Sequence, residues 1–158
     1  MKVKLKVNTK LKNIEKRVNA VKNMYDTTFL TGKISRDMEK EVGLRFRNEV
    51  DTDGKVWESL KPRTIVRRYN SGLKKKKGKN AVKGRPKILQ NTGRLKRSIK
   101  ARNTKTEAIV GTNVKYAAVH NFGSRKKNIP QRRFMGLNRG QRLKYKEWIR
   151  KWHKGELR

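Results

Sequence analysis

The sequence has no cysteine, only three prolines among its 158 residues, and only 12 acidic side chains. Without cysteine there is neither a disulfide bond nor thiolate chemistry. No apolar run approaches the roughly 18 residues of a membrane-spanning helix. The N-terminus alternates lysine with valine and leucine and lacks the apolar core of a signal peptide. We therefore expect synthesis in the cytoplasm and no membrane association.

Positive charge dominates what is present. The chain carries 46 Lys and Arg, which gives a formal net charge of +34. Residues 1–58 hold 14 basic and 9 acidic groups, whereas residues 59–158 hold 32 basic and 3 acidic groups. Such a chain repels copies of itself unless something anionic lies nearby. Nucleic acid, an acidic protein partner and a nucleotide bias of the genome are three explanations that composition leaves open.

Length and apolar content predict one domain over residues 1–158, with a thin core because only 33% of residues are hydrophobic. Residues 3–7 alternate like an edge strand. Apolar residues from position 11 to 25 recur every three or four residues and predict a helix that Thr9 caps and Gly32 ends. Ile34, Met38, Val42 and Phe46 recur every four residues and predict a second helix over residues 35–50, with Glu41 and Arg45 paired on its side.

A turn follows at Asp51-Thr52-Asp53-Gly54. With Glu49 and Glu58 it forms the only acidic cluster, so a metal site is one reading. An Asx-type turn is the reading we favour, because the spacing lacks the glutamate that closes a calcium loop. Trp57 is expected to be a core anchor, and residues 64–69 a short helix.

Residues 70–87 form a low-complexity basic segment that cannot bury apolar area, so we expect an exposed, flexible loop. Its lysines, and those of a second basic loop at residues 124–128, are candidates for contact with DNA or an acidic partner. The candidate residues are Lys74, Lys75, Lys76, Lys77, Lys79, Arg125, Lys126 and Lys127.

Between these loops the sequence predicts a β-hairpin. Its first arm runs over residues 94–102, where apolar and polar residues alternate except at Arg97, and its second over residues 107–112. Residues 116–123 predict one or two helical turns stopped by Gly123. Residues 132–135 predict an edge strand that returns to the sheet.

The last helix is predicted to begin at Asn138. Tyr145, Trp148, Ile149 and Trp152 share one face of it, opposite Arg and Lys. Packing on the sheet is the simpler explanation, and a docking surface is the alternative, since Trp and Arg are enriched in interface hot spots. Tyr145, Trp148, Trp152 and Phe134 are the candidate subunit-interface residues.

No catalytic motif is found. The phosphate-binding glycine loop is missing, and the two histidines, His120 and His153, lack the neighbours of a triad. His120 is expected to be partly buried with its hydrogen bonds satisfied. A nuclease that uses the acidic cluster to hold Mg²⁺ is a remote alternative. We expect no enzyme activity, no metal and no cofactor.

Several short motifs occur together in a fixed order. They are Asp51-Thr52-Asp53-Gly54 with Trp57, Leu60 and Thr64; Ile88-Leu89 with Thr92-Gly93-Arg94-Leu95 and Ser98-Ile99; Val110-Gly111-Thr112-Asn113; Tyr116-Ala117, His120 and Phe122-Gly123; and Ile129-Pro130 with Arg133-Phe134-Met135-Gly136. In this order they resemble the phage virion morphogenesis, or tail-completion, proteins, whose best-known members come from Mu-like phages. The family's usual His-Gln-Phe-Gly is His-Asn-Phe-Gly here, and Pro-Gln-Arg-Arg-Phe-Met-Gly replaces Pro-Ala-Arg-Pro-Phe-Leu-Gly.

The resemblance implies an α+β fold, with long N-terminal helices packed on a small, mostly antiparallel sheet, a C-terminal helix and extended basic loops. It implies a virion protein of the tail or neck that completes the tail end or joins tail to head. Its partners would be a homo-oligomeric ring, a hexamer or dodecamer, and the connector, terminator or tube rings, with phage DNA in the lumen as a further candidate. Because charge opposes self-association, we expect weak self-assembly in isolation and salt-sensitive binding to partners.

A stand-alone nucleic-acid-binding protein of ribosomal or chromatin type is the alternative. It needs only the charge and the lysine segment, and it leaves the ordered motifs unexplained.

Overall fold

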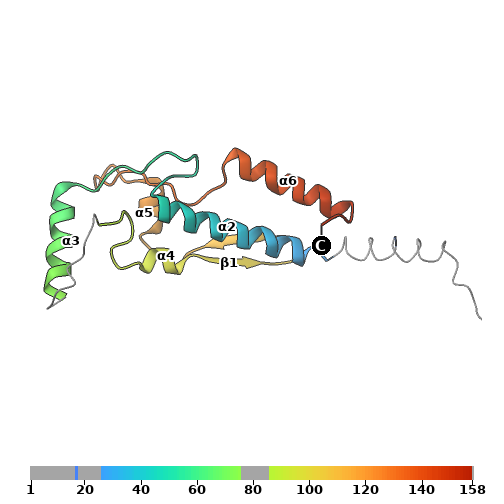
Figure 1. Ribbon diagram of the computed structural model, residues 1–158, viewed down its shortest axis with the longest axis horizontal. Helices are drawn as coiled ribbons and strands as arrows, with labels where there is room; N and C mark the ends of the chain where they lie inside the picture. The colour runs from blue at the N-terminus through green and yellow to red at the C-terminus, as the bar shows by residue number, and fades with distance from the viewer. Residues whose placement is uncertain (1–16, 18–25, 76–85, 158) are drawn as a thin grey trace, which may run out of the picture.

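A computed structural model describes residues 26–75 and 86–157, together with Arg17. Its elements are α2 (Thr28–Asn48), α3 (Pro62–Lys75), α4 (Arg94–Ser98), β1 (Lys100–Asn103), β2 (Ala108–Gly111), α5 (Ala117–Phe122) and α6 (Arg139–His153). α2 lies between the β1–β2 hairpin and α6, while α3 stands at the far end, across the direction of α2 (Figure 1). The expected α+β fold with a small antiparallel sheet and a C-terminal helix is confirmed.

Apolar side chains on α2 build two clusters along its length. Val42 and Phe46 belong to the larger one, which also holds Trp57, Ile88, Leu95, Ile99, Val114, Ala117 and Phe134. Leu30 and Ile34 belong to the smaller one, where they meet Tyr145 of α6. Trp57 is 3% exposed and meets Phe46 edge to face, so its predicted role as a core anchor is confirmed.

The predicted break at Gly32 is wrong, because α2 continues through this residue. Gly32 is buried, and a Cβ atom there would lie 3.5 Å from the side-chain amide of Asn103 in the hairpin. That distance is ordinary van der Waals contact, so packing of α2 against the hairpin, and not a need for glycine, carries the helix through this position. The predicted strand at residues 3–7 and the predicted helix before Asp26 lie outside the described residues, apart from Arg17, which is helical.

The first hairpin arm is also corrected. Residues 94–98 are helical, and the strand begins only at Lys100. Leu95 and Ile99, both buried, are four positions apart, which is the spacing of one helix face. Arg97, which interrupted the alternation, is exposed and donates from Nη2 to the Thr92 carbonyl at 2.9 Å. The pairing of β1 with β2, the intervening turn and the stop of α5 at Gly123 are as predicted.

The expected loop at residues 70–87 begins later than predicted, because α3 extends to Lys75. Lysine is a good helix former, and this continues the helix past Gly72. Residues 76–85 lie outside the described part of the chain. No helix in the described segments is long and apolar enough to cross a bilayer.

Candidate binding surfaces

Residues 131–136, here called the return segment, are held against the core, but they do not form the predicted edge strand. The backbone N–H groups of Phe134 and Met135 both donate to Oδ1 of Asn121, at 3.1 and 2.9 Å. The N–H of Arg132 donates to the carbonyl of His120 at 2.8 Å. The Asn121 side chain and the His120 carbonyl, both on α5, thus accept the hydrogen bonds that a neighbouring strand was predicted to accept.

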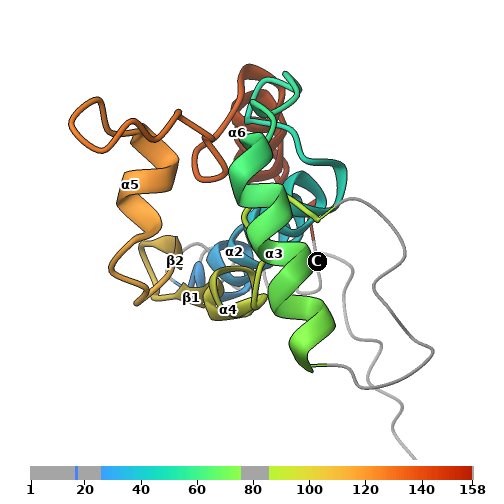
Figure 2. The same cartoon turned by 90° about the vertical axis from the view of Figure 1, so that its left-hand side faces the viewer.

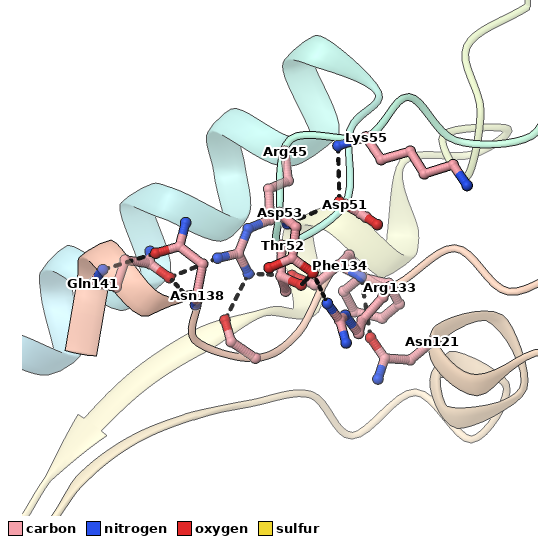
Figure 3. A network of polar contacts seen from close by, with 11 residues as sticks. Arg45, Asp51, Thr52, Asp53, Lys55, Asn121, Arg133, Phe134, Asn138 and Gln141 are labelled. Atoms are coloured by element: carbon pink, nitrogen blue, oxygen red, sulfur yellow. Dashed lines mark hydrogen bonds and ion pairs between the residues drawn. The ribbon is translucent and has the colours of Figure 1, made fainter. Parts of the chain in front are cut away.

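A buried guanidinium completes this arrangement (Figure 3). Arg45 on α2 is 4% exposed, and its Nη1 donates to the carbonyls of Phe134 and Gly136 at 2.9 and 2.8 Å. Its Nη2 donates to Oε1 of Gln141 at 2.8 Å. Burial lowers the pKa of Arg45, and Glu41 opposes that shift, yet the predicted ion pair with Glu41 is replaced by these three bonds. Arg45 thereby fixes the return segment and α6 to α2.

Gln141 also belongs to the cap of α6. Asn138 accepts the Gln141 N–H at 2.7 Å, and Gln141 Oε1 accepts the Asn138 N–H at 3.1 Å, which is a complete capping box. The predicted start of the last helix at Asn138 is confirmed. Because the same Gln141 oxygen bonds to Arg45, the start of α6 and the centre of α2 share one polar network.

Three of the four carboxylates of the acidic cluster accept hydrogen bonds or pair with an arginine within the fold. Asp51 Oδ1 accepts the N–H groups of Asp53 and Lys55 at 2.8 and 2.9 Å, which confirms the Asx-type turn. Glu49 Oε1 accepts the Ile88 N–H at 2.5 Å, and Asp53 pairs with Arg133. Residues 26–75 and 86–157 contain no group of three or more potential acidic, histidine or cysteine ligands around a common point.

Two of the four predicted interface residues are core residues. Phe134 is fully buried and packs at 5.2 Å between ring centres against Phe46. Tyr145 is 6% exposed in the smaller cluster. Trp148 and Trp152 are partly buried, with Trp152 stacked on Phe29 at 5.8 Å and Lys33 lying over Trp148 at 4.9 Å. This face of α6 therefore packs within its own chain, but mainly on α2, so the expected packing on the sheet is corrected.

Other apolar side chains face outward: Leu143 and Phe122 were not predicted as interface residues, and Ile149 was placed on the aromatic face of the last helix. Leu143 on α6 is 56% exposed and Ile149 is 41% exposed. Phe122 at the end of α5 is 72% exposed. The one signal that the sequence offered for Phe122 is its position directly before Gly123, where the predicted helical turns end. Leu143 lies outside the single aromatic stripe, so the periodicity gave no reason to single it out.

The predicted basic contacts divide between described and undescribed residues. Lys74 and Lys75 are the last residues of α3, and Lys76, Lys77 and Lys79 lie outside the described part of the chain. Arg125, Lys126 and Lys127 are exposed on a loop closed by a bridge between Ser124 and Ile129. Gly123 precedes it at φ +76°, and a Cβ there would lie 2.9 Å from the backbone nitrogen of Gln131. The loop is therefore held close to the return segment, and its cations point to no acidic partner among the described residues.

A second basic feature was not predicted from the sequence. A groove of about 470 Å³ lies where α3 meets the chain segments at 89–95 and 116–132, and its lining contains five cations, His120 and no carboxylate. His120 is half-buried, and its Nδ1 is buried without a hydrogen-bond partner in the described structure, so the expected satisfied imidazole is wrong. Burial lowers the pKa of His120, and the charges of Arg132 and Arg68 lower it further.

A buried tyrosine adds a pH-dependent contribution to stability. The Tyr145 hydroxyl donates to Asp37 at 2.9 Å, and Lys144 donates to the same carboxylate at 2.8 Å. Burial, with the bond to Asp37, raises the pKa of Tyr145 above its usual value near 10. The unfolded chain therefore loses this proton at lower pH than the folded one, so the stabilisation is complete below pH 10 and declines as pH rises.

We expect Tyr145→Phe to lower the free energy of unfolding by about 1–2 kcal/mol at pH 8, because a hydrogen bond to a charged group is lost. Above pH 10 the wild type should lose about 1.4 kcal/mol per pH unit relative to the variant. Urea denaturation of both proteins between pH 8 and pH 11 measures this. A difference that is constant over that range would contradict the assignment.

Taken together, the described polar groups hold loops and helices in place, and the exposed surface carries cations interrupted by single apolar side chains. These features define a small α+β binding or assembly protein. The model of the phage virion morphogenesis family matches residues 7–154, and the chain belongs to that family. No curated protein and no solved structure matched the chain. Membership gives the protein a role in the structure or assembly of a phage virion, in a family that is not a class of enzymes.

Proposed function

We propose that the protein is a structural component of a tailed-phage virion that completes the end of the tail or joins tail to head as part of a neck ring. The family match over residues 7–154 carries this proposal. Its mechanism is binding without catalysis, with homologous subunits and adjacent connector, terminator or tube rings as partners. The virion tail or neck is the proposed location.

Exposed apolar side chains of α6 support a contact with a neighbouring subunit. Leu143 and Ile149 are exposed there among cationic side chains, while the tryptophans of the same helix are occupied by α2. An interface that buries these two side chains removes apolar area from water, and acidic groups on the neighbour would neutralise the surrounding charge. Leu143 and Ile149 replace Phe134 and Tyr145 as the proposed interface residues.

The exposed loop at Arg125, Lys126 and Lys127 supports a contact with something anionic, either an acidic neighbouring ring or DNA in the lumen. Each lysine or arginine that neutralises a phosphate releases a counterion, so such a contact weakens steeply with salt. Lys74, Lys75, Lys76, Lys77 and Lys79 are proposed to act in the same way. The exposed cations at Arg125, Lys126 and Lys127 also favour the alternative of a stand-alone nucleic-acid-binding protein.

Inactivating the gene in the phage distinguishes these functions. We expect electron microscopy of the lysate to show filled heads and separate tails, or tails with unfinished ends, and few joined particles. Wild-type protein supplied from a plasmid should restore joined particles. Normal, infectious particles that lack the subunit would contradict the proposal and favour the stand-alone nucleic-acid-binding protein.

A further inference from the structure

The groove beside α3 concentrates positive charge with no acidic side chain in its lining. Lys61, Arg67 and Arg68 come from α3 and the residue before it, Arg94 begins α4, and Arg132 lies on the return segment. Viewed from the α3 end, α3 stands in front and α5 lies beside it, to the left (Figure 2). Cations from three parts of the chain are therefore brought to one concave surface that no single run of sequence marks.

Two of these cations are fixed in position by carbonyl groups. Arg68 donates from Nη1 to the carbonyl of Lys87 at 2.9 Å. Arg132 is 6% exposed and donates from Nε and Nη2 to the carbonyls of Glu58 and Ser59, at 2.9 and 3.1 Å. Burial is the main cause that lowers the pKa of each, and repulsion between Arg132 and Arg68 adds to the shift for Arg132, while the charge of Glu58 opposes it. The hydrogen-bond partners are neutral carbonyls, so the charge of Arg68 is left uncompensated and that of Arg132 is offset only in part, by Glu58.

The other three cations are available to a ligand. Lys61, Arg67 and Arg94 are exposed, and within residues 26–75 and 86–157 none of them forms an ion pair. Among the described residues, ion pairs form at Arg133, Lys144, Arg150 and Lys151, none of which lines the groove. A concave surface lined by like charges is therefore a site of high positive potential, which attracts an anion.

An aromatic ring lies in the same groove. Tyr116 is 43% exposed, and its ring meets the His120 ring edge to face with 5.8 Å between centres. The side chains of Asn91, Thr92 and Asn128 add neutral hydrogen-bonding groups to the lining. Exposed aromatic rings beside arginines are the combination that binds single-stranded nucleic acid, where bases stack and phosphates pair with cations.

We propose that this groove binds a single nucleic-acid strand, with Arg67 and Arg94 contacting successive phosphates and Tyr116 stacking on an unpaired base. Arginine suits this role because its planar guanidinium offers two parallel donors to a phosphate. An acidic peptide would match the charge equally but would leave the exposed tyrosine without a partner. A duplex keeps its base faces stacked within the helix, so it would not use Tyr116. The groove adjoins the second basic loop at Asn128 but draws its cations from other parts of the chain, and the proposal does not depend on the position of the protein in the virion.

Binding of a fluorescent twelve-residue oligothymidylate to the purified full-length protein tests the charge contribution. The variant Arg67→Gln with Arg94→Gln is compared with Arg142→Gln with Lys146→Gln, which removes the same charge from exposed positions on α6. We expect the groove variant to bind at least tenfold more weakly than the α6 variant. The slope of log K against log salt should also decrease by about 1.4, because each phosphate contact on a single strand contributes about 0.7. Equal affinities of the two variants would overturn the proposal.

Tyr116→Ala tests the stacking contribution. We expect it to weaken oligothymidylate binding roughly fivefold or more, since stacking contributes about 1 kcal/mol or more per base, whereas Tyr116→Phe should bind as the wild type does. Binding of a duplex should not change. Loss of duplex and single-strand binding in equal measure would overturn the stacking assignment.

Two further ligands separate other sources of negative charge. An oligoglutamate peptide whose affinity falls in the groove variant, with oligothymidylate affinity unchanged, would assign the groove to an acidic protein segment. Inorganic phosphate that binds the wild type and not the groove variant in calorimetric titration, again with unchanged oligothymidylate affinity, would assign it to free phosphate. Either result would overturn the proposal.

Discussion

Replacing Arg45 by methionine is expected to lower the free energy of unfolding by about 3 kcal/mol or more. The guanidinium is 4% exposed and bonds to two carbonyls and to Gln141. Methionine fills a similar volume but leaves the carbonyls of Phe134 and Gly136 without this donor, while Gln141 Oε1 keeps only the Asn138 N–H, and each acceptor left unpaired costs about 1–3 kcal/mol. Relief from burying a charge offsets part of this loss. Urea denaturation followed by circular dichroism measures the change.

Arg47→Met is the matched control. Arg47 lies two residues further along α2 and is exposed, so its replacement should change stability by less than about 0.5 kcal/mol. Arg45→Lys retains the charge but not the planar fork, and we expect an intermediate loss. Equal effects at positions 45 and 47 would show that the buried network contributes little to stability.

Phe134→Ala should destabilise the protein by about 3–5 kcal/mol, because it empties a fully buried position in the larger cluster. The ring lies against Phe46, which is itself 0% exposed, so few neighbours are free to move into the space. Thermal and urea denaturation of the purified variant measure the loss.

Phe122→Ala provides the comparison, because the same side chain is removed where it is 72% exposed. We expect a change in stability within about 0.5 kcal/mol. If Phe134→Ala were as stable as Phe122→Ala and impaired only subunit association, the sequence-based assignment of Phe134 to an interface would be correct and the core assignment wrong.

Long periodic segments made much of the fold predictable. The four-residue spacing of Ile34, Met38, Val42 and Phe46 predicted the buried face of α2, and Asn138 predicted the start of α6. Single residues misled where a tertiary contact decided the conformation. Gly32 predicted a helix end, yet α2 continues through it where the helix packs against the hairpin.

Short segments were the least predictable, since a few alternating residues fit more than one structure. Residues 94–98 satisfied a strand pattern, although the four-residue spacing of Leu95 and Ile99 fits a helix turn equally well. Residues 132–135 are extended in pattern but bond to Asn121, His120 and Arg45 from distant parts of the chain. No local rule identifies those partners.

The candidate sites show the same division. Exposed cations at Arg125, Lys126 and Lys127 were predictable from composition alone. The groove was not, because its cations are separated in sequence and converge only after folding. The burial of Arg45 was not predictable either, because its spacing of four from Glu41 and of three from Val42 fits an exposed ion pair and a position beside the core alike.

The unequal division of apolar residues along α2 has a mechanical consequence. The cluster around Val42 and Phe46 holds nine buried residues, whereas the cluster around Leu30 and Ile34 holds three, with six partly buried residues packed against it. Local separation costs least where fewest apolar groups must be exposed. The contacts between α6 and the first half of α2 are therefore expected to open at a lower free-energy cost than the contacts around Val42 and Phe46.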